Sequence, residues 1–146
     1  MNIIDTNGIN YIFANNLTLQ DNYFLVPDVA EEVELTLLVH GRRLSNKVLE
    51  IVKHQLFDES VYLNHYNRIL NKYGGRSFYN MTGFGDVSII ATLHMFVEIF
   101  EAQKAVQLFD PTEQIVVFTD DNGLATKIMA EFNSNNIHVV RVNTIK

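Results

Sequence analysis

Three aspartates stand where the apolar pattern of the sequence changes. Asp5 closes the short apolar run 2–4, Asp121 follows the β-branched run 115–119, and Asp86 precedes a long apolar stretch. Carboxylates that are brought together repel one another, so a cluster of them is stabilised by bound cations. Hard oxygen ligands favour Mg²⁺ or Mn²⁺, and such ions support phosphodiester hydrolysis by activating water and stabilising the leaving oxygen. The three acids are therefore candidates for a metal-dependent hydrolytic site.

A structural role competes with this interpretation. Aspartate is a favoured helix N-cap, and Asp86 and Asp121 both stand where a helix is expected to begin. For either residue taken alone, capping is the more frequent role. Asp5 has no obvious capping duty in the sequence beyond the short helix expected after it.

The periodicity of apolar residues predicts the strands and helices that must position these acids. Apolar runs predict short strands at 2–4, 24–26, 115–119 and 137–142. Helical spacing predicts helices at 7–14, from Asp28 onward, at 44–56, 59–73, 86–100 and 122–133. Asp28 and Glu31 have the spacing of a capping pair, and Gly74-Gly75 is expected to end the fourth of these helices.

Alternating strands and helices imply an α/β fold, a three-layer α/β/α sandwich with a central parallel sheet. In open parallel sheets, ligands gather at the carboxyl ends of the strands, where the helices begin. Residues far apart in the sequence, such as Asp5, Asp86 and Asp121, are expected to converge there.

Length and composition limit the possible classes of protein. The 146 residues predict one domain spanning 1–146, and the absence of cysteine excludes disulfides, thiolate metal sites and cysteine nucleophiles. No apolar run approaches the roughly 20 residues that span a bilayer, and the first residues do not resemble a signal peptide. We therefore expect a cytoplasmic protein without a membrane partner.

Charge is unevenly distributed. The net charge is −6, yet the segment 42–76 carries seven basic and three acidic residues, whereas the remainder is net −10. This segment is expected to form a helical basic insertion that contacts phosphates, with ordinary solvated helix faces as the equally weighted alternative. Its candidate nucleic-acid-binding residues are Arg42, Arg43, Lys47, Arg68, Lys72 and Arg76.

Four segments, in order, resemble the motifs of the PIN-domain family across nearly the whole chain. Residues 3–7 (Ile-Ile-Asp-Thr-Asn) resemble its first motif, an apolar strand that ends in an acid. Residues 26–32 resemble the second, a strand that ends in proline, with the acid five residues later at Glu32. Residues 83–91 are similar to the third, with Asp86 at the head of an apolar helix. Residues 116–124 are similar to the fourth, an apolar strand followed by Thr-x-Asp and a later Leu.

This resemblance implies a metal-dependent endoribonuclease acting on single-stranded or loop RNA. Its catalytic and metal-binding residues would be Asp5, Glu32, Asp86 and Asp121, with one or two Mg²⁺ or Mn²⁺ ions. Asn7, Thr119 and Asp120 would support the site. Two positions stay open: Glu31 competes with Glu32, and Asp120 with Asp121, although the Thr-x-Asp spacing selects Asp121.

The same resemblance suggests a homodimer and a toxin of a toxin–antitoxin pair, with a cognate antitoxin protein as partner. Two alternatives stay open: a processing or turnover nuclease acting on RNA or DNA, and a non-catalytic PIN-like binding or scaffold module. Other hydrolase and phosphate-binding classes fit less well. Asn7 occupies the place of the second acid of haloacid-dehalogenase-like phosphatases, and neither a GxxxxGK[ST] loop nor a GxSxG elbow is present.

Overall fold

The computed structural model describes residues 1–79, 84–106, 114–132 and 136–146. Its centre is a five-stranded parallel sheet in the order β3-β2-β1-β4-β5. The chain therefore starts in the middle strand, runs outward to β3, and returns to the other side of β1. The strands are β1 (Asn2–Ile4), β2 (Tyr23–Leu25), β3 (Val48–Glu50), β4 (Ile115–Phe118) and β5 (Ile137–Val140).

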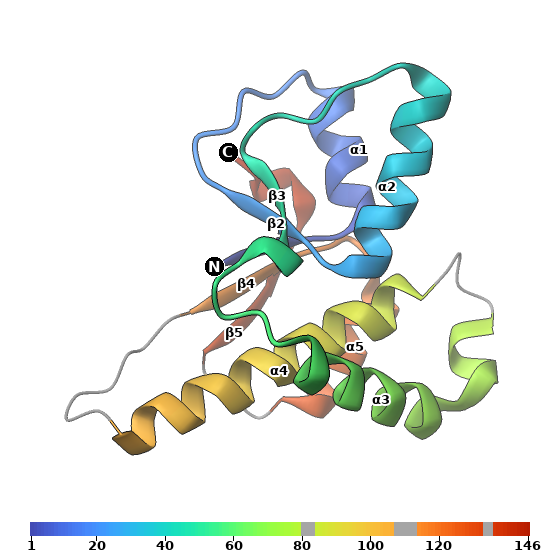
Figure 1. Ribbon diagram of the computed structural model, residues 1–146. Helices are drawn as coiled ribbons and strands as arrows, with labels where there is room; N and C mark the ends of the chain where they lie inside the picture. Colours follow the sequence, from blue (N-terminus) through green and yellow to red (C-terminus); the bar gives the residue numbers. More distant parts are fainter. Residues whose placement is uncertain (80–83, 107–113, 133–135) are drawn as a thin grey trace.

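Helices cover both faces of this sheet. In Figure 1, α1 and α2 lie above it, and α3 and α4 lie below it. The predicted α/β class with a parallel sheet is confirmed, and the arrangement is compatible with a three-layer sandwich. The helices are α1 (Thr6–Ala14), α2 (Pro27–His40), α3 (Glu59–Tyr79), α4 (Gly85–Val106) and α5 (Asn122–Glu131), with short 3₁₀ turns η1 (Ile51–Lys53) and η2 (Val142–Thr144).

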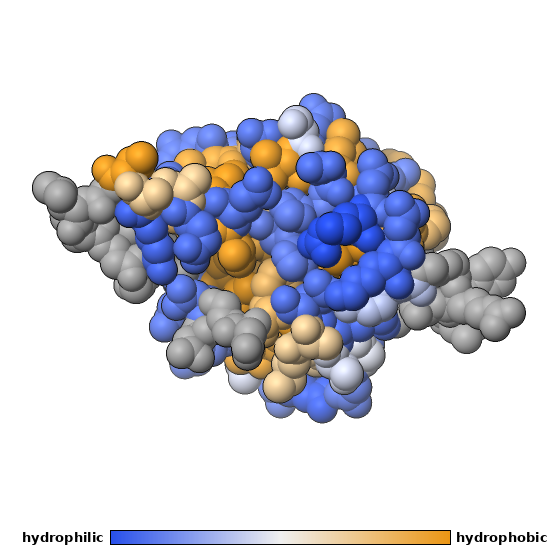
Figure 2. Space-filling view, turned by 90° about the horizontal axis from the view of Figure 1, so that it is seen from below, coloured by the Kyte–Doolittle hydropathy of each residue, from blue (hydrophilic) through white to orange (hydrophobic). Residues whose placement is uncertain are grey.

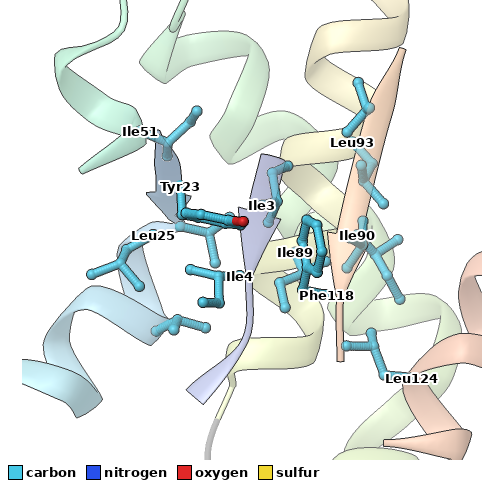
Figure 3. Packing of buried hydrophobic residues seen from close by; sticks show 14 of the residues in the cluster. Ile3, Ile4, Tyr23, Leu25, Ile51, Ile89, Ile90, Leu93, Phe118 and Leu124 are labelled. Atoms are coloured by element: carbon cyan, nitrogen blue, oxygen red, sulfur yellow. The ribbon is translucent and has the colours of Figure 1, made fainter. Parts of the chain in front are cut away.

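The core forms where α4 packs on the middle of the sheet. Ile89, Ile90 and Leu93 of α4 are fully buried and lie beside Ile3 of β1 and Phe118 of β4 (Figure 3). The first two turns of α4 are buried on all sides, as its continuous apolar sequence predicts. The outer face seen from below is mostly hydrophilic, with apolar residues in separate patches (Figure 2).

Two predicted elements are wrong. The segment 44–56 is not a helix, because Val48–Glu50 pairs in register with β2 as an edge strand and the turn η1 follows it. Long-range pairing therefore overrides the local helical period, and the segment 42–76 includes a strand of the central sheet. Helix α3 continues through Gly74-Gly75 to Tyr79. A glycine inside a helix costs only about 1 kcal/mol, which is too little to end it.

The start of α2 also differs from the prediction. Pro27 is its first residue, and Val26 is an N-cap without a side-chain hydrogen bond. Asp28 therefore lies inside the first turn and does not form a capping pair with Glu31. Within the described ranges, no helix has the length and apolarity needed to cross a membrane.

Candidate functional site

The candidate site lies at the point where the order of the strands reverses. The chain leaves β1 toward β2 on one side, whereas β4 pairs with β1 on the other. Asp5 directly follows β1, and its backbone N–H donates to the carbonyl of Phe118 at the end of β4 (3.1 Å). Such a reversal leaves a crevice at the carboxyl ends of the strands, where ligands of open α/β sheets bind.

Asp5 is held from two sides. Its Oδ1 accepts from the backbone N–H of Thr6 (2.8 Å), and its Oδ2 accepts from Thr119 Oγ1 (2.9 Å). Only 9% of the residue is exposed. Burial raises the pKa of Asp5, the two hydrogen bonds oppose this, and the charge of Asp121 adds to it. Asp5 is also the N-cap of α1, the short helix after it, which was the one capping duty that the sequence left open.

Thr119 connects Asp5 to Asp121. While its hydroxyl donates to Asp5, the same oxygen accepts from the backbone N–H of Asp121 (3.0 Å). Asp121 Oδ1 accepts from the backbone N–H of Leu124 (3.1 Å), so Asp121 caps α5 as its position predicts. Capping uses one of its oxygens, and its charge still acts on Asp5 and on Asp86.

Asp120 has a different role from its neighbour. Its Oδ1 accepts from the backbone N–H of Val142 (3.1 Å), and its carbonyl accepts from Arg141 Nη1 (3.2 Å). Its own N–H donates to Asn7 Oδ1 (3.3 Å). These bonds fasten the segment after β5 and the start of α1 to the loop after β4, so Asp120 positions the loop from which Asp121 projects.

Glu32 approaches the site from α2. Its Oε2 accepts from Thr6 Oγ1 (2.9 Å), on the residue next to Asp5. Burial raises the pKa of Glu32, the bond from Thr6 opposes this, and the charge of Asp5 adds to it. A Cβ placed on Gly85 would lie 3.8 and 3.9 Å from its two carboxylate oxygens, so Glu32 also faces the start of α4. Glu31 is exposed to solvent.

Of the four acids, Asp86 has the least favourable surroundings for its carboxylate. It is 8% exposed, and its Oδ2 is buried without a hydrogen-bond partner in the described part of the chain. Because α4 begins at Gly85, Asp86 lies inside the first turn and is not its N-cap. The pKa of Asp86 is raised to about 7, and burial is the largest cause of this rise. The charges of Asp121, Asp5 and Glu32 contribute to it, and the charge of Lys127 opposes it.

These acids lie in one another's electrostatic field, but their side chains do not form a ready coordination sphere. Across residues 1–79, 84–106, 114–132 and 136–146, no three acidic or histidine side chains are placed to hold a metal ion. Asp5, Glu32 and Asp121 each accept a hydrogen bond from the protein instead. Their oxygens suit Mg²⁺ or Mn²⁺ chemically, and the unpartnered Asp86 oxygen needs a ligand or a proton. Coordination would require these side chains to turn toward a shared ion.

One group of predicted basic residues lies away from the acids. Arg42 follows Gly41, the C-cap of α2, so the 14 residues of the helix place it roughly 20 Å from the helix start. Its guanidinium lies 5.1 Å from the ring centre of Phe13, near the end of α1. The carbonyl of Lys47 accepts from the backbone N–H of Tyr23, at the amino end of β2 (2.8 Å). Arg42, Arg43 and Lys47 are thus not brought together with the acids.

The second basic group joins a buried polar network that the sequence did not reveal. Lys72 of α3 pairs with Glu131 at the end of α5, whose side chain is only 4% exposed. Glu131 also accepts from Tyr73 Oη (2.7 Å) and contacts His94 Nε2 (3.0 Å). Although burial opposes ionisation, these partners lower the pKa of Glu131 to about 2. Arg68 lies beside His65, and the side chain of Arg76 is outside the described residues.

Comparisons with models of protein families, with curated proteins and with solved structures found no match to this chain. Membership of the PIN-domain family therefore stays a prediction from the four motifs, and the argument for function depends on the geometry of the acids.

Proposed function

We propose that this protein is a metal-dependent endonuclease that hydrolyses phosphodiester bonds of RNA. One observation carries the proposal. Acids from separate elements meet in one electrostatic field at the strand-order reversal, and one of them has a buried oxygen that finds no partner among the described residues. Asp5, Glu32, Asp86 and Asp121 would hold one or two Mg²⁺ or Mn²⁺ ions there.

The charge of the site supports this choice of substrate chemistry. Four carboxylates without a counter-ion would repel a phosphate, whereas divalent cations among them would attract one. Bound ions of this kind activate water and stabilise the leaving oxygen of a displacement at phosphorus. RNA as the polymer, and a toxin or processing role, are proposed from the motif resemblance alone.

Different residues of the chain would orient each of the four acids. Thr119 and the N–H of Thr6 fix the orientation of Asp5, and the first turn of α5 fixes Asp121. Asp86 projects from the rigid, buried head of α4. Glu32 is oriented by the Thr6 hydroxyl. Ligands that are held by rigid elements lose less entropy when they bind an ion or a substrate.

Cleavage of labelled single-stranded RNA in Mn²⁺ or Mg²⁺ tests the proposal. The wild type should cut and leave a 5′-phosphate on the downstream product. The double variant Asp5→Asn, Asp86→Asn should lose at least about 100-fold of the rate, since both substitutions remove charged ligands. Glu31→Gln is the matched control, because Glu31 is an exposed acid beside Glu32 and should retain activity. Equal cleavage by wild type and double variant would refute the assignment.

The non-catalytic alternative has an observation of its own. Three of the acids accept hydrogen bonds from the protein, and no set of three in the described ranges is arranged around an ion. A binding module of this kind would bind RNA with the same affinity in EDTA and in Mn²⁺ and would cut in neither. The expected homodimer and a small antitoxin partner are further proposals, and sedimentation of the purified chain tests the first.

A further inference from the structure

A pocket lies at the head of α2, which also carries Glu32. It is an open pocket of about 710 Å³ between the head of α2, the segment after β3 and the first turns of α3. Its walls include Phe57, Tyr62, Tyr66 and Leu63, and its polar groups include Asp28 and Glu59. The volume is in the range of pockets that bind small molecules.

The aromatic rings of this pocket are contiguous. The ring centres of Phe57 and Tyr62 are 5.4 Å apart, and those of Tyr62 and Tyr66 are 5.8 Å apart. Tyr62 is 5% exposed, and its hydroxyl is bonded to Ser88 Oγ (2.7 Å), which fixes the ring from behind. Leu63 at the rim is 46% exposed. The ring planes are tilted by 44° between Phe57 and Tyr62 and by 50° between Tyr62 and Tyr66, so a planar heterocycle can stack on one ring only. The half-buried ring of Tyr66 is the one available for stacking, because Tyr62 is buried.

The polar groups of the pocket determine which heterocycles it can bind. Among the described residues, those that line the pocket include two carboxylates and no lysine or arginine, so this lining would repel a phosphate. Tyr66 Oη donates to Asp28 Oδ2 (2.7 Å) and holds that carboxylate in place. A carboxylate has further acceptor capacity and no donor. It therefore favours a heterocycle that presents N–H groups and disfavours one that presents carbonyls.

The head of α2 carries residues of both the pocket and the acidic site. Asp28 stands one helical turn before Glu32, a rise of about 6 Å along α2. The backbone N–H of Asp28 donates to Ser88 Oγ (3.3 Å), and Ser88 lies two residues beyond Asp86 on α4. A nucleotide whose phosphate sat at the acids could thus place its own or a neighbouring base in the pocket.

We infer that this pocket is a base-binding subsite for a base with an exocyclic amino group, stacked on the half-buried ring of Tyr66 beside the buried Tyr62 and read by the carboxylates of Asp28 and Glu59. As a subsite for RNA, it rests on the proposed function. Cytosine offers N4–H₂ to a carboxylate, whereas uracil offers a carbonyl at the same place. The subsite would therefore direct cleavage to positions beside amino-bearing bases and away from uracil.

Cytidine and uridine form a matched pair for the test, because they differ only along one edge of the base: cytidine has an amino group at position 4 and an acceptor at N3, whereas uridine has a carbonyl at position 4 and an N–H at N3. Each nucleoside is titrated into the full chain in EDTA, and the ring resonances of Tyr62 and Tyr66 are followed by NMR. Cytidine should bind at least about fivefold more tightly than uridine, the lower limit for one base-edge contact. Guanosine and inosine, which differ in one amino group, should show the same order.

Variants assign the preference to the carboxylates. Asp28→Asn should narrow the difference between cytidine and uridine, because an amide can donate to the uracil carbonyl. Glu59→Gln tests the second carboxylate in the same way. Tyr66→Phe keeps the ring and removes the bond to Asp28, so it should retain the preference for cytidine. Glu34→Gln, an exposed acid elsewhere on α2, is the control and should change nothing.

Three results would overturn the inference: equal binding of cytidine and uridine, no shift of either ring with any nucleoside, or shifts with an arginine amide alone. The last would identify a cation-binding cage for a protein partner. The titration contains no metal and no cleavage step, so it is independent of the proposed function. Loss of the cytidine preference with intact RNA cleavage refutes only the subsite. Cytidine binding without any metal-dependent cleavage refutes only the nuclease.

Discussion

Asp86 gives the sharpest prediction about stability. Its surroundings raise its pKa from 3.8 to about 7, by burial and by the charges of the other three acids. A rise of this size in the pKa is equivalent to about 4 kcal/mol of unfavourable free energy when Asp86 is ionised in the folded protein. Asp86→Asn keeps the shape of the side chain and removes the charge. Without metal, the variant should therefore be more stable than the wild type at alkaline pH.

The dependence on pH follows from proton binding. Between pH 4 and 7, folded Asp86 binds a proton that the unfolded chain has already lost, so the stability of the wild type falls as pH rises through this range. The variant lacks this contribution. Its advantage should be small at pH 4 and should grow toward pH 8, to an upper limit of about 4 kcal/mol, reduced by any polar group that the new amide leaves unpaired.

Urea unfolding of both proteins in EDTA at pH 4, 6 and 8 measures this difference. The control is Glu31→Gln, which removes an exposed acid outside the set and should change stability by less than about 0.5 kcal/mol at every pH. A constant difference between Asp86→Asn and the wild type across the three pH values would refute the argument. So would a variant that is less stable than the wild type at pH 8.

Three further predictions concern the same regions. Mn²⁺ at ten times its dissociation constant should stabilise the wild type by about 1.4 kcal/mol and the double variant Asp5→Asn, Asp86→Asn by much less; equal shifts of the melting temperature would contradict a shared metal site. Gly85→Ala should cost roughly 1 kcal/mol in stability, because its Cβ would lie 3.2 Å from Cγ2 of the buried Val29; a variant as stable as the wild type in urea would contradict this. Glu131→Gln should lower the free energy of unfolding by roughly 1–3 kcal/mol at pH 7. This loss should vanish as pH falls from 4.5 toward 2, because the lowered pKa means that only the ionised form of Glu131 stabilises the fold. A loss that persists at pH 2 would show that packing, and not charge, is responsible.

The sequence predicted the central elements well because their signals are local. The β-branched run 115–119 and the apolar stretch after Asp86 each specify a buried element without reference to the rest of the chain. By contrast, β3 is a strand because Val48–Glu50 pairs with β2, and no local signal separates it from a helical turn. Gly74-Gly75 failed as a helix end because glycine is a weak breaker within a long helix.

The candidate site was predictable to a similar extent. Strand ends and helix heads located Asp5, Asp86 and Asp121 in the sequence, but only the fold shows that Asp86 is not a cap and that Asp5 is one. The network around Glu131 of α5 could not be foreseen, since its partners come from two other helices, α3 and α4, and have no characteristic spacing. The aromatic pocket was equally hidden, because Asp28 and Tyr66 meet only after α2 and α3 have docked.

The central claim is that the four carboxylates form one divalent-metal site, and Mn²⁺ observed directly in a crystal tests it best. Crystals soaked in millimolar Mn²⁺ should show an anomalous-scattering peak within about 2.0–2.3 Å of oxygens from at least two of Asp5, Glu32, Asp86 and Asp121. Asp86 Oδ2, which has no hydrogen-bond partner in the part of the chain that the structure describes, should be among them. A map with no peak among these carboxylates, or with manganese bound only elsewhere on the surface, would contradict the account.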